Sequence, residues 1–166
     1  MSDNLKIRCD KIYQDYLDIV CEQIQRYEAL ENDFPTGVLN EIRAVFTHFA
    51  KMNAKENIDE KVRELDDAER HIKRAIRDCY KYNCIAYENN YKIFHDHFVR
   101  SAYTDECLIK IEEEHDKAIN NLIVARRAET SVNNDGIGVN KKEYDNYEEA
   151  ISHFKAMYDL IHHNAK

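Results

Sequence analysis

The spacing of apolar residues predicts helices along almost the whole chain. Apolar side chains recur every three or four residues, which is the period of an α-helix, and not every second residue as in a half-buried strand. Five helices are predicted, over about 4–31, 37–54, 58–99, 105–129 and 141–164. We therefore expect an all-α fold: a five-helix bundle with long helices 1 and 3, forming one domain over residues 1–166.

The first predicted helix has an apolar arc wider than a surface helix usually needs. The arc is formed by Leu5, Cys9, Ile12, Tyr13, Tyr16, Val20, Ile24 and Tyr27. We expect such a helix either to lie at the centre of the bundle or to share its face with a partner chain. The candidate interface residues are Tyr13, Tyr16, Val20 and Tyr27.

The second predicted helix has a narrower and more regular apolar stripe than the first. In the second, the inward positions are Val38, Leu39, Ile42, Val45, Phe46, Phe49 and Met52. The third is long for a compact domain, and a break is expected around residues 87–92. If the helix continues, Asn83, Asn90 and His97 point inward; if it breaks, Asn90 and His97 face water. Of these two alternatives we favour the break.

Glycine and proline are rare, which supports the helical interpretation. The chain has one proline, Pro35, and three glycines, and neither residue type occurs between Val38 and Asp135. Strand-rich domains need such residues at frequent turns. Residues 130–140 form the one long predicted loop, after which Asn140 and Glu143 have the spacing of a helix-capping pair.

Length and charge limit the class of protein. A chain of 166 residues is long enough to bury roughly 70% of its unfolded surface. Its net charge of −8 argues against a protein that coats nucleic acid or an anionic membrane. No apolar run approaches the ~20 residues needed to cross a bilayer, and the charged start MSDNLKIRCDK does not have the apolar core of a signal peptide. We expect a cytoplasmic protein.

The five cysteines agree with that compartment. Their number is odd, and no two have the C-x-x-C spacing that indicates zinc or a redox pair. We interpret them as small core residues in a reducing environment.

Arg43 and His48 are the candidate catalytic residues. Four residues separate them on the second predicted helix. This R-x4-H spacing within an acidic helical bundle resembles the HEPN superfamily of metal-independent ribonucleases. The resemblance implies a composite site at a dimer interface, of the kind found in prokaryotic toxin and defence systems. There the histidine acts in proton transfer as the RNA 2′-hydroxyl attacks the phosphodiester, and the arginine steadies the phosphate charge.

A structural role for the same two residues is the alternative. Five steps of about 100° place Arg43 and His48 roughly 140° apart, on opposite borders of the apolar stripe. A site would need a bent turn or a second subunit. Otherwise both residues flank the core, with Arg43 packing its stem and pairing with an acid.

The third predicted helix carries basic residues that face away from its apolar side: Arg70, Lys73, Arg74, Arg77 and Lys81. With Tyr80 and Tyr82 nearby, they are the candidate RNA-binding residues if the protein is a ribonuclease. However, Asp66–Arg70 and Glu69–Lys73 have the acid-first spacing of an ordinary exposed helix face.

No complete metal site is predicted. Glu112 and His115 form one E-x-x-H motif, whereas a di-iron bundle needs two such motifs and further inward glutamates. We expect His115 to be a hydrogen-bonded core histidine. The runs His95-Asp96-His97 and His162-His163 lack further ligands. No metal and no cofactor are therefore expected, and no phosphate-binding loop is present.

The function expected from the sequence is protein–protein association without catalysis, as a homo-oligomer or as a subunit of a larger complex. The partner would be the chain itself or another helical protein. The alternative is a HEPN-like ribonuclease that acts on RNA through Arg43 and His48.

Overall fold

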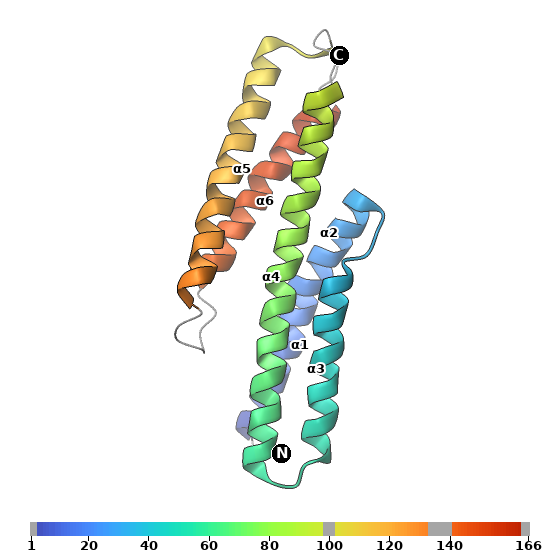
Figure 1. Ribbon diagram of the computed structural model, residues 1–166, viewed down its shortest axis with the longest axis vertical. Helices are drawn as coiled ribbons and strands as arrows, with labels where there is room; N and C mark the ends of the chain where they lie inside the picture. The colour runs from blue at the N-terminus through green and yellow to red at the C-terminus, as the bar shows by residue number, and fades with distance from the viewer. Residues whose placement is uncertain (1–2, 98–101, 133–140, 164–166) are drawn as a thin grey trace. The chain divides into compact units, whose positions relative to one another are not determined.

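The computed structural model describes residues 3–97, 102–132 and 141–163, and in this part of the chain there are helices and no strands (Figure 1). The elements are α1 (Asp3–Asp15), η1 (Tyr16–Val20), α2 (Cys21–Glu31), α3 (Thr36–Ala54), α4 (Ile58–His97), α5 (Asp105–Val132) and α6 (Lys141–His163). The all-α helical prediction is confirmed for the described residues. None of these helices is long and apolar enough to cross a membrane.

The chain divides into two compact units, Met1–Cys79 and Tyr80–Lys166, called unit 1 and unit 2 below. The division falls inside α4, which continues through it. The expected capping pair of Asn140 and Glu143 lies outside the residues whose side chains are described. That the whole chain forms a single domain remains a prediction.

The prediction that helices 1 and 3 are long is wrong when the helices are numbered as they occur in the structure. The first helical stretch is interrupted by η1, a turn of π-helix in which the Cys21 N–H bonds to the Tyr16 carbonyl. The third α-helix, α3, has 19 residues, and the 40-residue helix is α4. Apolar spacing did not reveal η1, because a single π turn shifts the later residues by only part of a helical turn.

The expected break at 87–92 is also wrong, since α4 is continuous there. The Asn90 side-chain amide donates to the Ala86 carbonyl at 2.9 Å, and this bond is compatible with the helix. Tyr87 and Tyr91 are buried, so packing also holds this segment. Of the polar residues expected to point inward in a continuous helix, Asn83 is buried, whereas Asn90 is half-buried and His97 exposed.

Side chains and backbone groups mark the ends of the helices. Asn32 adopts the left-handed conformation (φ 51°) and donates its N–H to the Glu28 carbonyl, which closes α2. The Asn57 side chain accepts hydrogen bonds from the N–H groups of Asp59 and Glu60 at the start of α4. The two acids there also lie favourably with respect to the helix dipole.

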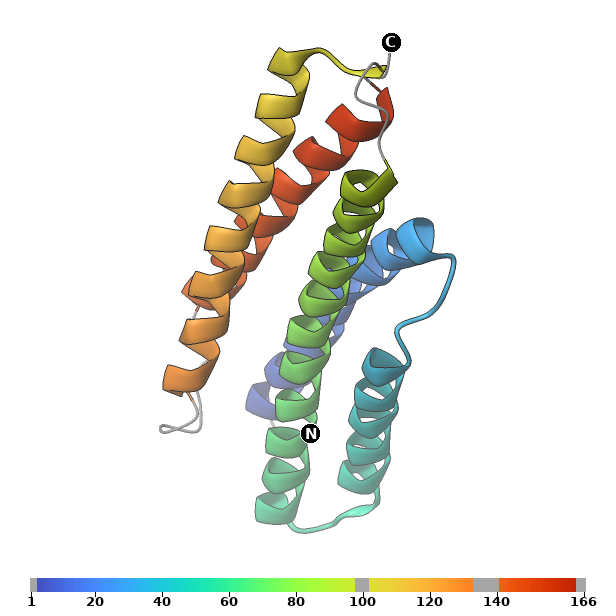
Figure 2. The same cartoon turned by 45° about the horizontal axis from the view of Figure 1, so that its top comes forward.

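Unit 1 packs α1, α2, α3 and the first half of α4. In Figures 1 and 2, α3 and α4 run side by side in opposite directions, joined by the short connection after Ala54. Arg8 of α1 donates to both Asp66 and Glu69 of α4, at 2.6 and 2.7 Å. The buried apolar residues of unit 1 include Leu5, Cys9, Ile12, Val20, Ile24, Val38, Val45, Phe49, Met52, Leu65, Ala68, Ile72 and Ile76.

Unit 2 packs α5 and α6 with the second half of α4. Its core is aromatic: the ring of Tyr80 stacks on Tyr147, and that of Tyr87 stacks on Phe154. The other buried apolar residues include Cys84, Tyr91, Ile111, Ala118, Ala125, Ala150, Ile151, Met157 and Ile161.

All five cysteines of the chain are free thiols, and burial raises the pKa of Cys79 to about 12. That pKa fits the inert core role expected for it.

Candidate functional site

The antiparallel pairing of α3 and α4 brings two histidines and two glutamates together in unit 1. His48 Nδ1 lies 2.7 Å from Glu64 Oε2, and His71 Nδ1 lies 2.6 Å from Glu41 Oε2. The two imidazole rings stack, with centroids 5.2 Å apart. Each helix carries a glutamate and, seven residues later, a histidine. Because the two helices run in opposite directions, the histidine of each helix lies opposite the glutamate of its neighbour.

Asp67 adds a second carboxylate beside His48. Its Oδ2 lies 4.0 Å from His48 Nδ1, while its Oδ1 forms an ion pair with Arg70. The hydrogen bond from His48 holds the pKa of Glu64 below its usual range, and the positive charge of Lys51 adds to this effect. Sequence reasoning singled out His48 and missed both acids. The spacing Glu64-x-x-Asp67 opposite His48 in a helical hairpin was the available signal.

Arg43 is not brought to His48 within one chain. Its side chain is exposed, and no acid among the described residues forms an ion pair with it. It shares a helix face with Leu39 and Phe46, four residues before it and three after, whereas His48 is held by Glu64 of α4. A composite site would require Arg43 from a second chain, and it remains a prediction.

The candidate RNA-binding residues of α4 lie close to acids. Arg70 pairs with Asp67, Arg74 Nη1 lies 3.9 Å from Glu41 Oε2, and Lys81 Nζ lies 2.6 Å from Glu129 Oε2. Lys73 and Arg77 also have partners. Phosphate binding by this set would compete with these contacts.

The candidate interface residues differ in their accessibility. Tyr13 is exposed, and its ring lies against Phe49 with centroids 5.3 Å apart. Tyr16 and Tyr27 are half-buried. Val20 is completely buried, so its side chain cannot reach a partner in this structure.

Around Tyr13 lies an exposed apolar surface that joins α1 and η1 to α3. Its exposed members are Tyr13 (49%), Leu17 (62%), Leu39 (46%) and Phe46 (60%). Tyr13 and Phe46 also line a small apolar pocket of about 30 Å³, together with Ile12, Tyr16, Ile42, Val45, Phe49 and Ile72. Leu17 follows Tyr13 by four residues and Leu39 precedes Phe46 by seven, so each lies close to the same side of its helix. We call this surface the α1–α3 apolar face and define it by Tyr13, Tyr16, Leu17, Leu39, Ile42 and Phe46.

In unit 2, the residues of the E-x-x-H motif have separate partners on α4. Tyr91 Oη donates to Glu112 Oε2 at 2.8 Å, and His115 Nε2 lies 2.8 Å from Glu88 Oε2. His115 is half-buried and hydrogen-bonded. The two residues of the motif therefore do not point to a common centre.

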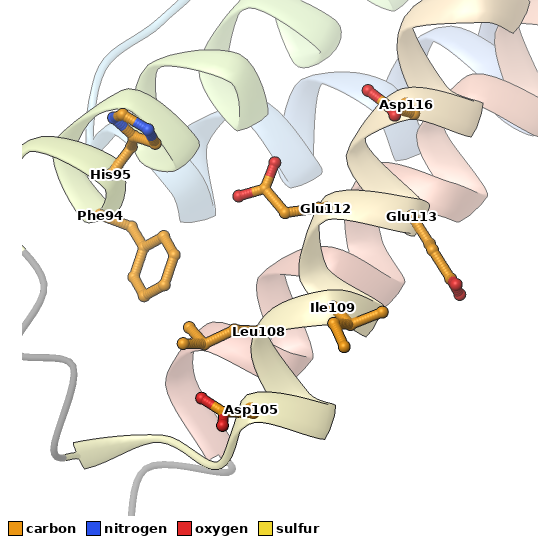
Figure 3. Close-up of a pocket in the computed structure, with 8 residues that line it drawn as sticks. All are labelled: Phe94, His95, Asp105, Leu108, Ile109, Glu112, Glu113 and Asp116. Carbon is orange, nitrogen blue, oxygen red and sulfur yellow. The ribbon is translucent and has the colours of Figure 1, made fainter.

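An open pocket of about 640 Å³ lies between the end of α4 and the start of α5 (Figure 3). It is lined by Phe94, His95, Asp105, Leu108, Ile109, Glu112, Glu113 and Asp116. Figure 3 shows the carboxylates of Glu112 and Glu113 on different sides of α5 and Asp105 at its start. These acids surround the pocket without converging on one point.

The remaining histidine runs lie on exposed helix ends. His95 and His97 are exposed, and His95 lies 3.6 Å from Asp96. His162 and His163 are exposed as well. Neighbouring atoms remove part of the water around the His162 ring, and this partial desolvation lowers its pKa. Neither run gains further metal ligands among the described residues.

No family model, curated protein or solved structure matches this chain, so the resemblance to HEPN ribonucleases rests on Arg43, His48 and the helical outline.

Proposed function

We propose that the protein acts through protein–protein association, and that its α1–α3 apolar face binds a second copy of the same chain. The observation that carries this proposal is the exposure of Tyr13 and Phe46, which line one apolar pocket, with the exposed Leu17 one helical turn after Tyr13. Large apolar side chains exposed singly are ordinary, whereas a contiguous patch of a few hundred Å² indicates an interaction site.

The composition of the face fits an interface centre. Aromatic residues and arginine contribute most to binding in such centres. Tyr13 and Phe46 supply rings, and Arg43 lies between Leu39 and Phe46 on the same helix face. An exposed arginine of this kind can cover a partner's apolar surface with its stem while its guanidinium stays hydrated.

A second copy is the occupant that these residues favour. In a two-fold dimer the same patch meets itself, so the patch has to be complementary to itself. An apolar surface meets this requirement, because apolar side chains attract one another without regard to sign. The chain has a net charge of −8, so two copies repel each other wherever acids meet. The six residues that define the face include no acid.

In a dimer, the face would form the apolar centre of the contact. Each partner contributes ~800 Å² to a standard interface. The remaining area would come from the polar rim around it.

Sedimentation equilibrium of the full chain tests the proposal. We expect a mass above the 19.7 kDa of one chain at micromolar concentrations. Phe46→Glu should give the monomer mass while circular dichroism stays helical, because Phe46 is 60% exposed and its replacement leaves the core intact. The matched control is Ile93→Glu, which changes an equally exposed residue (62%) outside the face.

A wild-type chain that sediments as a monomer over this range would reject the proposal. The same conclusion would follow if both variants dissociated equally, since the effect would then be general and not specific to the face.

A further inference from the structure

We propose that His48, Glu64 and Asp67 form a binding site for one divalent transition-metal ion of the Zn²⁺ class. The three side chains come from α3 and α4 of unit 1. One potential ligand atom from each lies within 4.8 Å of the other two. The site is independent of the proposed association, because it lies between α3 and α4 and shares no residue with the α1–α3 apolar face.

The convergence of two carboxylates on one ring nitrogen distinguishes His48 from other paired histidines. At His48, Glu64 Oε2 lies 2.7 Å and Asp67 Oδ2 4.0 Å from the same atom, Nδ1. At His115, the two nearest acids lie at opposite nitrogens: Glu88 at Nε2 and Asp116 at Nδ1. One ion cannot bind both of those acids together with the ring.

His153 and His71 show the same contrast. His153 has Glu114 at Nδ1 and Glu149 at Nε2, again on opposite sides of the ring. His71 has Glu41 at Nδ1. A structural hydrogen bond between helices explains the acid at Nδ1 of His153 and of His71. It does not explain the second acid, Asp67, at Nδ1 of His48.

The distances fit a small ion after modest adjustment. Zinc lies about 2.0–2.2 Å from nitrogen and oxygen ligands in a tetrahedron, which places the ligand atoms roughly 3.3 Å apart. The gap from His48 Nδ1 to Glu64 would lengthen from 2.7 Å, and the gap to Asp67 would shorten from 4.0 Å. Each change is under about 1 Å, and water would fill the fourth position.

The charges around the site are compatible with a dication. Two carboxylates and a neutral imidazole supply two negative charges, which an ion of charge 2+ neutralises. Arg70 pairs with Asp67 Oδ1, whereas the other oxygen, Oδ2, is the one 4.0 Å from His48. Lys51 and Lys55 act on Glu64 through their charge and would weaken binding to some degree.

The chemistry of the ligands selects the class of metal. An imidazole nitrogen with two carboxylates suits Zn²⁺, Co²⁺, Ni²⁺ or Mn²⁺, whereas Mg²⁺ prefers oxygen ligands alone. Because the ligands come from two helices, the bound ion would link α3 to α4. Binding should therefore stabilise the folded chain against heat.

Calorimetric titration of the EDTA-stripped full chain with ZnCl₂ tests the site, and the Co²⁺ absorption spectrum reports the coordination geometry. We expect one ion per chain, a higher Tm with zinc, and loss of both effects in His48→Ala. Asp67→Asn should weaken binding by more than about tenfold, because the loss of an outer-sphere partner alone already costs about that much.

Two controls separate ligation from structure. Arg70→Gln removes the same ion pair as Asp67→Asn but keeps the carboxylate, so it should retain zinc binding. His115→Ala removes an interhelical pair in unit 2 and should also bind one ion. Absence of saturable binding would overturn the proposal, as would zinc binding that survives both His48→Ala and Asp67→Asn.

Discussion

The rings of Tyr91 and His115 lie face to face, with centroids 3.8 Å apart and planes 14° apart. Each residue also bonds to an acid on the opposite helix: Tyr91 of α4 to Glu112 of α5, and His115 of α5 to Glu88 of α4. The four side chains thus link the two helices by a stack and two hydrogen bonds. Burial and the nearby acids raise the pKa of Tyr91 above its usual range, so its hydroxyl remains a donor near neutral pH.

Replacing His115 with alanine should destabilise the fold by about 1–3 kcal/mol, because the ring stack with Tyr91 and the hydrogen bond to Glu88 are both lost. Urea unfolding followed by circular dichroism measures the change. Ile93→Ala is the control, since this residue of α4 is 62% exposed and should change the stability by less than about 0.5 kcal/mol. Equal effects of the two substitutions would show that the stack contributes nothing specific.

The lowered pKa of Glu64 predicts a pH dependence of stability. A carboxylate with a depressed folded-state pKa stabilises the protein above its unfolded pKa, and this contribution is lost as pH falls through the folded value. In EDTA, Glu64→Gln should therefore be less stable than wild type at pH 7. The difference should shrink below about pH 4.5, where the free side chain becomes protonated.

Unfolding midpoints measured between pH 3 and pH 7 provide this comparison. Glu56→Gln is the control, because Glu56 is exposed and forms no ion pair with the described residues. A difference in stability between wild type and Glu64→Gln that stayed constant over the whole pH range would contradict this link between the pKa of Glu64 and stability.

Asn57→Ala should cost about 1 kcal/mol, the usual effect of removing a helix N-cap. The Asn57 side chain accepts from the N–H groups of Asp59 and Glu60. Amide hydrogen exchange should show faster exchange at these two positions, while those near Tyr87 remain protected. Asn57→Asp serves as the conservative control and should retain the cap.

Metal-independent cleavage of single-stranded RNA is not expected in EDTA. Glu64 holds His48 toward α4, and Arg43 lies on a different face of α3. A gel assay with a labelled RNA checks this directly. Cleavage by the wild type that is lost in both Arg43→Ala and His48→Ala would instead support the ribonuclease hypothesis.

The positions of the helices could be predicted because the signals for them are local in the sequence: the spacing of apolar residues and the scarcity of glycine and proline. The described ends of α3, α4 and α6 lie close to the predicted ones. The exposure of Leu39 and Phe46 could not be predicted in this way. Their spacing matches that of core residues, and only the packing of neighbouring helices decides which part of an apolar stripe is covered.

The acids near His48 were missed for a related reason. Glu64 and Asp67 are remote from His48 in the sequence, and they approach it only because α3 and α4 pair in a particular antiparallel register. Sequence spacing along one helix finds partners three or four residues away and does not find those on a neighbouring helix. Histidine–acid pairs between helices thus depend on tertiary structure.

The placement of the division between the units inside α4 has a consequence for folding. Cys79 and Tyr80 are both buried, and no glycine or proline lies near them. A protease that needs an extended, accessible segment would find none at this point. During synthesis, moreover, unit 1 can be complete only when half of α4 has been made, and that half ends without a cap. Cooperative unfolding of the two units would follow naturally from a helix that belongs to both.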